Sequence, residues 1–182
     1  EVKNLDNSFL LKSDNIIYNT KLKNIKSNTP SQIEDAVGNN IEVGNFIFLL
    51  DKNLIKLNFV KVIDTEKNIT QIEKAYIDLN LNRIVGKDIS INFNDKSAGQ
   101  GNEPRLKGKT ILITDQNSII NKGVFTTCKK NDDCPPWQIS AKEIKHDKKK
   151  KTINYKDAWL KVYDIPVLYF PRFFHPDPTV KR

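Results

Sequence analysis

The only two cysteines of this chain, Cys128 and Cys134, lie in one polar stretch, residues 126–147. One of the only two histidines, His146, lies near the end of the same stretch, and the other, His175, follows further on among prolines. Thiols and imidazoles are the side chains that form redox pairs and zinc sites. The stretch could therefore be a redox centre, a metal site or a disulfide that stabilises the fold.

The spacing of these residues argues against a redox or metal centre. Five residues separate the two cysteines, whereas a CxxC redox motif has only two between them and a zinc site of this kind has a second cysteine pair. The adjacent Asp132 and Asp133 are more typical of a solvated loop than of acid–base catalysis. The sequence contains no glycine-rich phosphate loop, GxSxG or HExxH motif. We therefore expect no enzyme activity, no bound metal and no cofactor.

The composition predicts a globular chain that favours anionic partners. Of the 182 residues, 38% are hydrophobic and 29% are charged, and the formal net charge is +8. Nucleic acid, an acidic membrane surface and a phosphorylated lipid are partners that such a charge favours. The densest basic run, residues 145–151, is either a solvated hairpin turn or a phosphate-binding patch. No run of about 18 apolar residues occurs, so we expect no transmembrane helix.

Apolar and polar residues alternate along most of the chain, which is the pattern of β-strands. The exception is residues 29–40, where Pro30 suits the first turn of a helix and Gly38 could end it. Thr29 could cap this helix, and Gln32 would complete a capping box. We therefore predict an all-β fold with one short helix near the N-terminus.

Pairs of the alternating segments flank short turns at a near-constant interval along the chain. Asn and Asp suit such turns because their side chains can bond the nearby backbone. A stack of related units, each burying its apolar face against its neighbours, accounts for the repeat, and the units are too short for propeller blades. We predict antiparallel hairpins stacked into a folded, jellyroll-like sheet with open edges. The predicted turn residues are Asn19, Asp51, Asn80, Asp115 and Asp147.

The two halves of such a sheet enclose an apolar interior, and the clearest alternation identifies its candidate residues. Alternation does not distinguish a dry core from a groove that holds a ligand, so both interpretations stay open for each of them. Phe93 and Val124 are additional candidates. The main candidates are Ile41, Val43, Phe46, Phe48, Leu57, Phe59, Ile89, Ile91, Ile111, Ile113 and Ile139.

Four motifs in the last third of the chain resemble one protein family. An aromatic–threonine stretch ends in a cysteine at Phe125–Cys128, and Trp137 opens a strand. A hairpin with His-Asp follows at Ile144–Asp147, and a Pro-Val-x-Tyr-x-Pro segment follows at Pro166–Pro171. Together they resemble the region that precedes the transmembrane barrel in the LptD family, also called OstA. The upstream repeats resemble OstA-like repeats, so the resemblance extends over nearly the whole chain.

The resemblance implies a fold, a function and a place in the cell. Members of this family assemble lipopolysaccharide at the outer membrane, and their N-terminal periplasmic domain is a V-shaped β-jellyroll. This chain would be that domain over residues 1–163, with residues 164–182 as a connector toward a C-terminal outer-membrane β-barrel. It would lie at the periplasmic face of the Gram-negative outer membrane, and it would shield the acyl chains of the lipid without catalysing a reaction.

The resemblance also implies partners. The N-terminal strand edge would receive lipopolysaccharide from an LptA-like bridge protein, and an LptE-like lipoprotein would plug the barrel of the full-length protein. Open edges would let the isolated domain associate with itself edge to edge. The alternatives are an LptA-like or LptC-like bridge protein and, from the positive charge, a nucleic-acid-binding β domain. We expect lipopolysaccharide rather than nucleic acid as the ligand.

A periplasmic location would make the two cysteines a disulfide, because that compartment is oxidising. A Cys128–Cys134 bridge would close a small loop and contribute about 2 kcal/mol in the chain-entropy model. In the family, a cysteine at the position of Cys128 can instead pair with one at the far end of the barrel. We predict the local bridge, which would act as a staple between the last two hairpin repeats.

Overall fold

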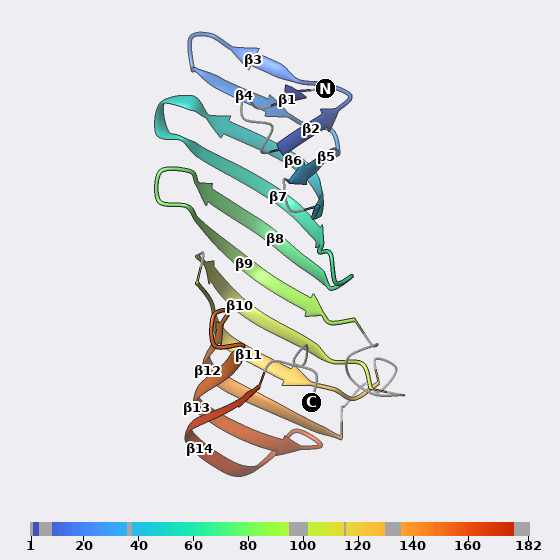
Figure 1. Cartoon of the computed structure of the whole chain (residues 1–182), viewed down its shortest axis with the longest axis vertical. Coiled ribbons are helices and arrows are strands. Elements are labelled where there is room, and N and C mark those ends of the chain that lie inside the picture. The colour runs from blue at the N-terminus through green and yellow to red at the C-terminus, as the bar shows by residue number, and fades with distance from the viewer. Residues whose placement is uncertain are drawn as a thin grey trace.

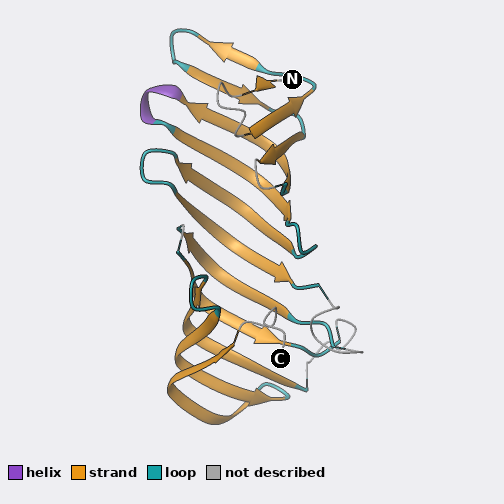
Figure 2. Ribbon diagram, in the orientation of Figure 1, coloured by secondary structure: helices purple, strands orange, loops and turns teal. Residues whose placement is uncertain are grey.

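The computed structural model of the chain describes residues 2–3, 9–35, 38–94, 102–114, 116–129 and 136–176. The described residues form one 14-stranded antiparallel sheet, with a single helical turn, η1, between two of its strands (Figures 1 and 2). The predicted all-β, jellyroll-like fold is therefore confirmed. The elements are β1 (Val2–Lys3), β2 (Phe9–Ser13), β3 (Ile17–Asn19), β4 (Asn24–Ser27), β5 (Ser31–Asp35), β6 (Asn40–Leu49), η1 (Leu50–Lys52), β7 (Leu54–Ile63), β8 (Ile69–Asp78), β9 (Arg83–Asn92), β10 (Arg105–Ile113), β11 (Asn117–Thr126), β12 (Trp137–Asp147), β13 (Thr152–Val162) and β14 (Ile165–Pro176).

From β6 to β14 each strand pairs with its neighbours in sequence, as the predicted hairpin stack requires. Two of the predicted turn residues bond the backbone as expected: Asn19 Oδ1 accepts from the Leu22 amide at 2.9 Å, and Asp147 Oδ1 accepts from the Lys150 amide at 2.9 Å. In the β8–β9 turn this role belongs to Asp78, whose Oδ1 accepts from the Asn80 amide. The predicted turn residue Asp51 lies in η1, and Asp115 lies outside the described residues.

The predicted helix over residues 29–40 is wrong, because Ser31–Asp35 forms β5 between β2 and β6. The Thr29 hydroxyl bonds the Ser27 hydroxyl at 3.0 Å instead of capping a helix. Ser31 is buried and Ile33 packs against the core, while the residue between them is exposed, so the segment has the period of a strand. A helix this short forms only a few backbone bonds after a costly nucleation, whereas two flanking strands offer partners on both sides.

The N-terminal end of the sheet divides at β6. Its first half pairs with β5 and its second half with β4. Three serine hydroxyls meet at this division: Ser31 Oγ donates to Ser13 Oγ at 2.9 Å, and Ser13 Oγ lies 2.9 Å from Ser27 Oγ. Ser27 and Ser31 are buried. Because these hydroxyls bond one another, a polar cluster occupies the N-terminal end of the interior without an unsatisfied hydroxyl.

Every second strand of the regular stack has one left-handed residue in its middle. These are Phe59 of β7 (φ 55°), Asp88 of β9 (φ 53°), Lys122 of β11 (φ 51°) and Asp157 of β13 (φ 50°). The strand registers align the four residues in one row across the sheet. We call this row the crease.

At the crease the inward-facing set of each strand shifts by one residue. Side chains of a regular strand face the same side at every second position, yet the buried residues that flank the crease are three apart. Each strand thus turns both of its arms toward one interior, and the sheet folds along the crease. Buried pairs of this kind are Val43 and Phe46, Leu57 and Val60, Ile72 and Ala75, Ala141 and Ile144, and Tyr155 and Ala158.

Small residues occupy the inner side of the crease, where the two arms converge. Ala158 is fully buried opposite Ala141, and Gly86 lies opposite Ala75. A Cβ atom on Gly86 would lie 2.8 Å from Cγ2 of both Ile72 and Ile111, which is too close for carbon atoms. The inner side of the crease therefore requires residues without a large side chain.

Residues 164–182, predicted to be a connector, are in part a strand of the sheet. β14 pairs with β13 through most of its length, so the sheet does not stop at residue 163. β14 is the edge strand, and Pro166 and Pro171 lie in it, which fits the exclusion of proline from central strands. Residues 177–182 lie outside the described residues.

Candidate functional site

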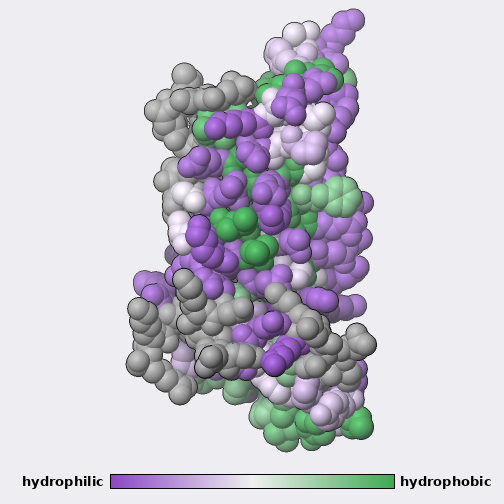
Figure 3. All heavy atoms as spheres, turned by 90° about the vertical axis from the view of Figure 1, so that its right-hand side faces the viewer, coloured by the Kyte–Doolittle hydropathy of each residue, from purple (hydrophilic) through white to green (hydrophobic). Residues whose placement is uncertain are grey.

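A cavity of about 380 Å³ lies between the arms of the folded sheet, where strands that are not neighbours in the sheet face each other. β8, β9 and β10 line it together with β11, β12 and β13. Figure 3, which presents the right-hand side of Figure 1, shows hydrophobic side chains at the surface between hydrophilic ones in the middle of that face. The apolar wall of the cavity consists of Ile91, Phe93, Leu106, Ile111, Ile113, Ile120, Ile144 and Ile153.

Ten of the eleven predicted interior residues lie on the inner face or are at least half-buried, and one is wrong. Phe59 is 68% exposed, because its left-handed backbone at the crease turns its side chain outward. Phe48 is half-buried, two residues from the buried Phe46 and thus on the same face. Val124 lies between the buried Gly123 and Phe125, so it faces the other side. The buried residues are Val43, Phe46, Leu57, Ile89 and Ile111, and those that pack against them are Ile41, Ile91, Ile113 and Ile139.

The cavity gathers only part of the predicted set. Ile91, Ile111 and Ile113 line it, as does the additional candidate Phe93. The sequence interpretation missed four other wall residues. Alternation could not assign their face because it does not locate the shift at the crease. The missed residues are Leu106, Ile120, Ile144 and Ile153.

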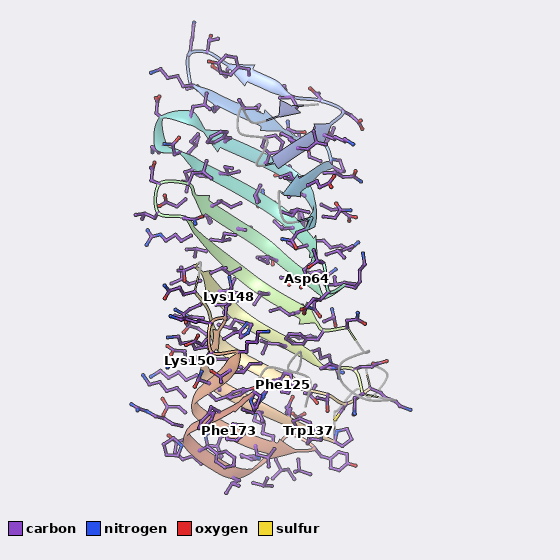
Figure 4. All side chains as sticks on the ribbon, in the orientation of Figure 1. Asp64, Phe125, Trp137, Lys148, Lys150 and Phe173 are labelled. Carbon is purple, nitrogen blue, oxygen red and sulfur yellow. The ribbon has the colours of Figure 1, made fainter. Side chains whose placement is uncertain are left out.

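The rim of the cavity has two lips of opposite charge. The turn between β7 and β8 supplies Asp64 and Glu66, which we call the acidic lip. The end of β12 and its turn into β13 supply His146, Lys148 and Lys151, which we call the basic lip. Figure 4 labels Asp64 and Lys148, which come from these two different turns. An apolar cavity with a charged rim is suited to an amphiphile, whose hydrocarbon part is buried while its polar part stays in water.

The basic run at residues 145–151 covers the end of β12 and its turn into β13, so it lies in a hairpin, and the phosphate-binding alternative stays a prediction. The run also borders a second groove, of about 760 Å³, along β12, β13 and β14. Lys145 follows the inward-facing Ile144 and therefore faces outward into this groove, where Arg172 also lies. The amide of Lys150, bonded to the Asp147 carboxylate, lowers the pKa of Asp147. The turn therefore presents basic side chains to both sides of the sheet.

Three curated proteins are similar to this chain, and all three are named LPS-assembly protein LptD. The protein from Nitrosomonas europaea is 26% identical over 139 residues, which cover 71% of this chain and 19% of that protein. The protein from Idiomarina loihiensis is 27% identical over 104 residues, covering 51% of this chain and 13% of that protein. The protein from Mannheimia succiniciproducens is 28% identical over 100 residues, covering 50% and 12%.

The resemblance to the LptD family is confirmed. The match spans less than a fifth of the length of each of these relatives. No family model matches the chain.

Two of the motifs that carry the resemblance to LptD meet in an aromatic cluster, which His175 of β14 completes. The ring of Phe125 lies 6.3 Å from that of Trp137 and 5.9 Å from that of His175, measured between centroids. His175 also lies 5.5 Å from the ring of Tyr155. Phe125, Trp137 and His175 belong to β11, β12 and β14, so the cluster ties the last strand to strands that it does not pair with. Figure 4 labels Phe125 and Trp137 in this region.

Cys128 lies beside the same cluster, in the segment that leaves β11. Its amide donates to Thr126 Oγ1 at 3.2 Å, and the Thr126 hydroxyl donates to the Trp137 carbonyl at 2.7 Å. The guanidinium of Arg105 donates to the Cys128 carbonyl. These bonds fix the start of the loop that the predicted staple would close. Its other end, Cys134, lies outside the described residues, as do Asp132 and Asp133, so the Cys128–Cys134 bridge stays a prediction.

Two further observations concern the described part of the chain alone. Within it, no helix has the length and apolar character needed to cross a membrane. The described histidine, cysteine and acidic side chains do not gather in threes that could hold a metal ion.

Proposed function

We propose that this chain is the β-jellyroll part of a lipopolysaccharide-assembly protein and that its interior receives the acyl chains of lipopolysaccharide. The observation that carries the proposal is one apolar core that extends from β2 to β13 and opens at a cavity with a charged rim. The name shared by the three LptD relatives supports lipopolysaccharide as the lipid. The proposed role is shielding and transfer, with no catalytic step.

The physical need for such a carrier follows from the cost of wetting hydrocarbon. Each methylene group moved into water costs about 0.8 kcal/mol, so an acyl chain of about 12 carbons resists exposure by roughly 10 kcal/mol. A folded sheet with an apolar inner face offsets this cost. Because the seam between its arms is open, the bulky sugar part of the lipid can stay in water.

In this proposal the domain lies at the periplasmic face of the outer membrane and precedes the β-barrel of the full-length protein. An LptE-like lipoprotein would join that barrel, and an LptA-like bridge protein would dock at the N-terminal end of the sheet. The edge there consists of β1 and β3, because β2 lies between β1 and β5. Ile17 and Tyr18 of β3 are exposed, which makes this strand the best candidate for strand addition. Without a partner, the same edge could pair with a second copy.

A photo-crosslinking amino acid at Ile113 and at Phe59 of the full-length protein tests the lipid site. Ile113 lines the cavity, whereas Phe59 points outward. We expect cells to yield a lipopolysaccharide adduct at Ile113, and also at Phe46 and Phe48, but not at Phe59. Adducts at Phe59 alone would place the lipid on the outer face and refute the proposal.

The same experiment at the edge separates this assignment from an LptA-like or LptC-like bridge protein. A crosslinker at Tyr18 should capture the bridge protein, and one in β14 should not. If this chain were instead a bridge protein that assembles in a row of copies, crosslinkers at both ends of its sheet would capture similar partners. Capture of the bridge protein from β14 alone would reverse the proposed direction of transfer.

A further inference from the structure

The lysines of the β12–β13 turn divide between two sides of the sheet. Lys148 and Lys151 line the apolar cavity, and Lys150 lines the groove along β12 to β14. Lys149 lines neither of them. Neighbouring lysines of one turn thus have different surroundings, although the sequence alone presents them as one undifferentiated basic run.

The basic lip is held in place by the adjacent β10–β11 turn. The Lys148 amide donates to the Gln116 carbonyl at 3.0 Å, and its ammonium group donates to the Thr114 carbonyl at 3.0 Å. An ammonium group has three donors, so this bond leaves Lys148 with capacity for an anion at the rim. The backbone of the turn is further ordered by the Lys150 amide, which donates to Asp147.

The acidic lip is also ordered, by a network of asparagines. The Asn68 amide and side chain each donate to the Asp64 carboxylate at 2.8 Å. Asn94 donates from its amide to Asn68 Oδ1 at 2.9 Å and from its side chain to the Glu66 carbonyl at 2.8 Å. The Asp64 carboxylate and the backbone of Glu66 therefore have fixed positions on the rim, where the two acidic side chains repel an anion.

We propose that Lys148 and Lys151 form a subsite for the anionic head group of an amphiphile, a phosphate or a carboxylate, whose hydrocarbon lies against Ile113, Ile144 and Ile153. The subsite rests on the proposed function, since it assigns an orientation to a lipid in the same cavity. Attraction at the basic lip and repulsion at the acidic lip both direct the head group to the β12–β13 side. The rim thus selects both the charge and the orientation of the ligand.

Binding of monododecyl phosphate to the chain, measured by isothermal titration calorimetry below the micelle concentration, tests the subsite. Dodecyl maltoside serves as the uncharged ligand with the same hydrocarbon, and inorganic phosphate serves as the head group alone. The variant is K148Q/K151Q, and the matched control is K149Q/K150Q, which removes the same charge from the same turn outside the cavity.

We expect K148Q/K151Q to weaken monododecyl phosphate binding about tenfold, the effect of two partly exposed ion pairs. The binding of dodecyl maltoside should stay unchanged, and K149Q/K150Q should bind both ligands as the unmodified chain does. Inorganic phosphate should bind far more weakly than monododecyl phosphate. Equal weakening in the two variants would reduce the effect to net charge and refute the subsite, and inorganic phosphate binding as tightly as the amphiphile would refute the role of the hydrocarbon.

The outcomes separate the subsite from the proposed function. If both dodecyl ligands bind to the unmodified chain and K148Q/K151Q alters neither, the interior is a lipid site and the subsite is wrong. If neither dodecyl ligand binds, the proposed function fails with it. Glu66→Gln provides a second measurement that leaves the lysines intact: removing an acid from the opposite lip should strengthen monododecyl phosphate binding several-fold, and no change would count against the polarity of the rim.

Discussion

The hydroxyl of Tyr155 lies 2.9 Å from Nε2 of His175 and holds the last strand of the sheet against its neighbour. Nδ1 of the same imidazole lies 2.6 Å from the Pro176 carbonyl, so Nδ1 carries the proton. With Nδ1 protonated in the neutral ring, Nε2 accepts and Tyr155 donates. The tyrosine is buried among Phe173 and His175, which raises the pKa of its hydroxyl above the ordinary range.

Tyr155→Phe should lower the free energy of unfolding at neutral pH by about 1 kcal/mol, because the His175 acceptor loses its donor. Above a pH of about 10 the unfolded chain releases the tyrosine proton while the folded chain retains it, so the native protein loses stability with rising pH, by at most about 1.4 kcal/mol per pH unit. The variant lacks this loss. Urea unfolding at neutral pH and above pH 10 should show that the difference in unfolding free energy between the unmodified chain and the variant narrows as the pH rises. A difference that stays constant would contradict the buried, protonated tyrosine.

Phe46 and Phe59 should respond very differently to truncation. Phe46→Ala should destabilise the domain by about 3–5 kcal/mol, because it opens a void in the core. Phe59→Ala should cost less than about 1 kcal/mol, since that ring is exposed. Urea denaturation of both variants measures the contrast. Similar losses at the two positions would mean that Phe59 is packed inside, as simple alternation predicts.

Gly86→Val should destabilise the fold by about 1–3 kcal/mol through overpacking at the inner side of the crease. The branched side chain would meet Ile72 and Ile111 at a point where the arms converge. Lys74→Val, on the exposed side of the paired strand, is the control for added β-branching. Thermal unfolding followed by circular dichroism compares the two. A Gly86→Val variant as stable as the control would show that the inner side of the crease can accommodate a valine side chain.

The predicted staple can be tested on the oxidised chain. If Cys128 and Cys134 are paired, neither thiol reacts with an alkylating reagent until a reductant is added, and mass spectrometry then records two modifications. Cys128→Ser should lower the free energy of unfolding under oxidising conditions by about 2 kcal/mol and have little effect under reducing ones. Immediate alkylation of the isolated oxidised chain would rule out the local bridge.

The strands were predictable because period-two alternation is a property of short segments. The turns at Asn19 and Asp147 were predictable because these side chains bond the nearby backbone. Phe59 was assigned to the wrong face because its orientation is not encoded in a short segment. Phe59 itself has a left-handed backbone, and the row of neighbouring strands sets this position. A phenylalanine in a sequence does not indicate such a conformation.

The prediction of a helix over residues 29–40 was wrong for a related reason. The residues that predict a helix start are genuine local preferences, but the Ser13 hydroxyl reaches those of Ser27 and Ser31 only when β2, β4 and β5 meet. The charged rim could not be predicted from the sequence either. The contrast between Lys148 and Lys149 arises from the folding of the sheet, which brings one end of β12 to the mouth of a cavity that begins at β8.

The crease also determines how a protein of this kind can change in size. Because each strand crosses the crease once, the cross-section of the interior depends only on the lengths of the two arms. Adding a hairpin would extend the molecule by two strand spacings, roughly 10 Å, and would leave that cross-section as it was. The fold is a trough of constant cross-section whose length is set by the number of hairpins. Its length can therefore change without a change in the width of the interior.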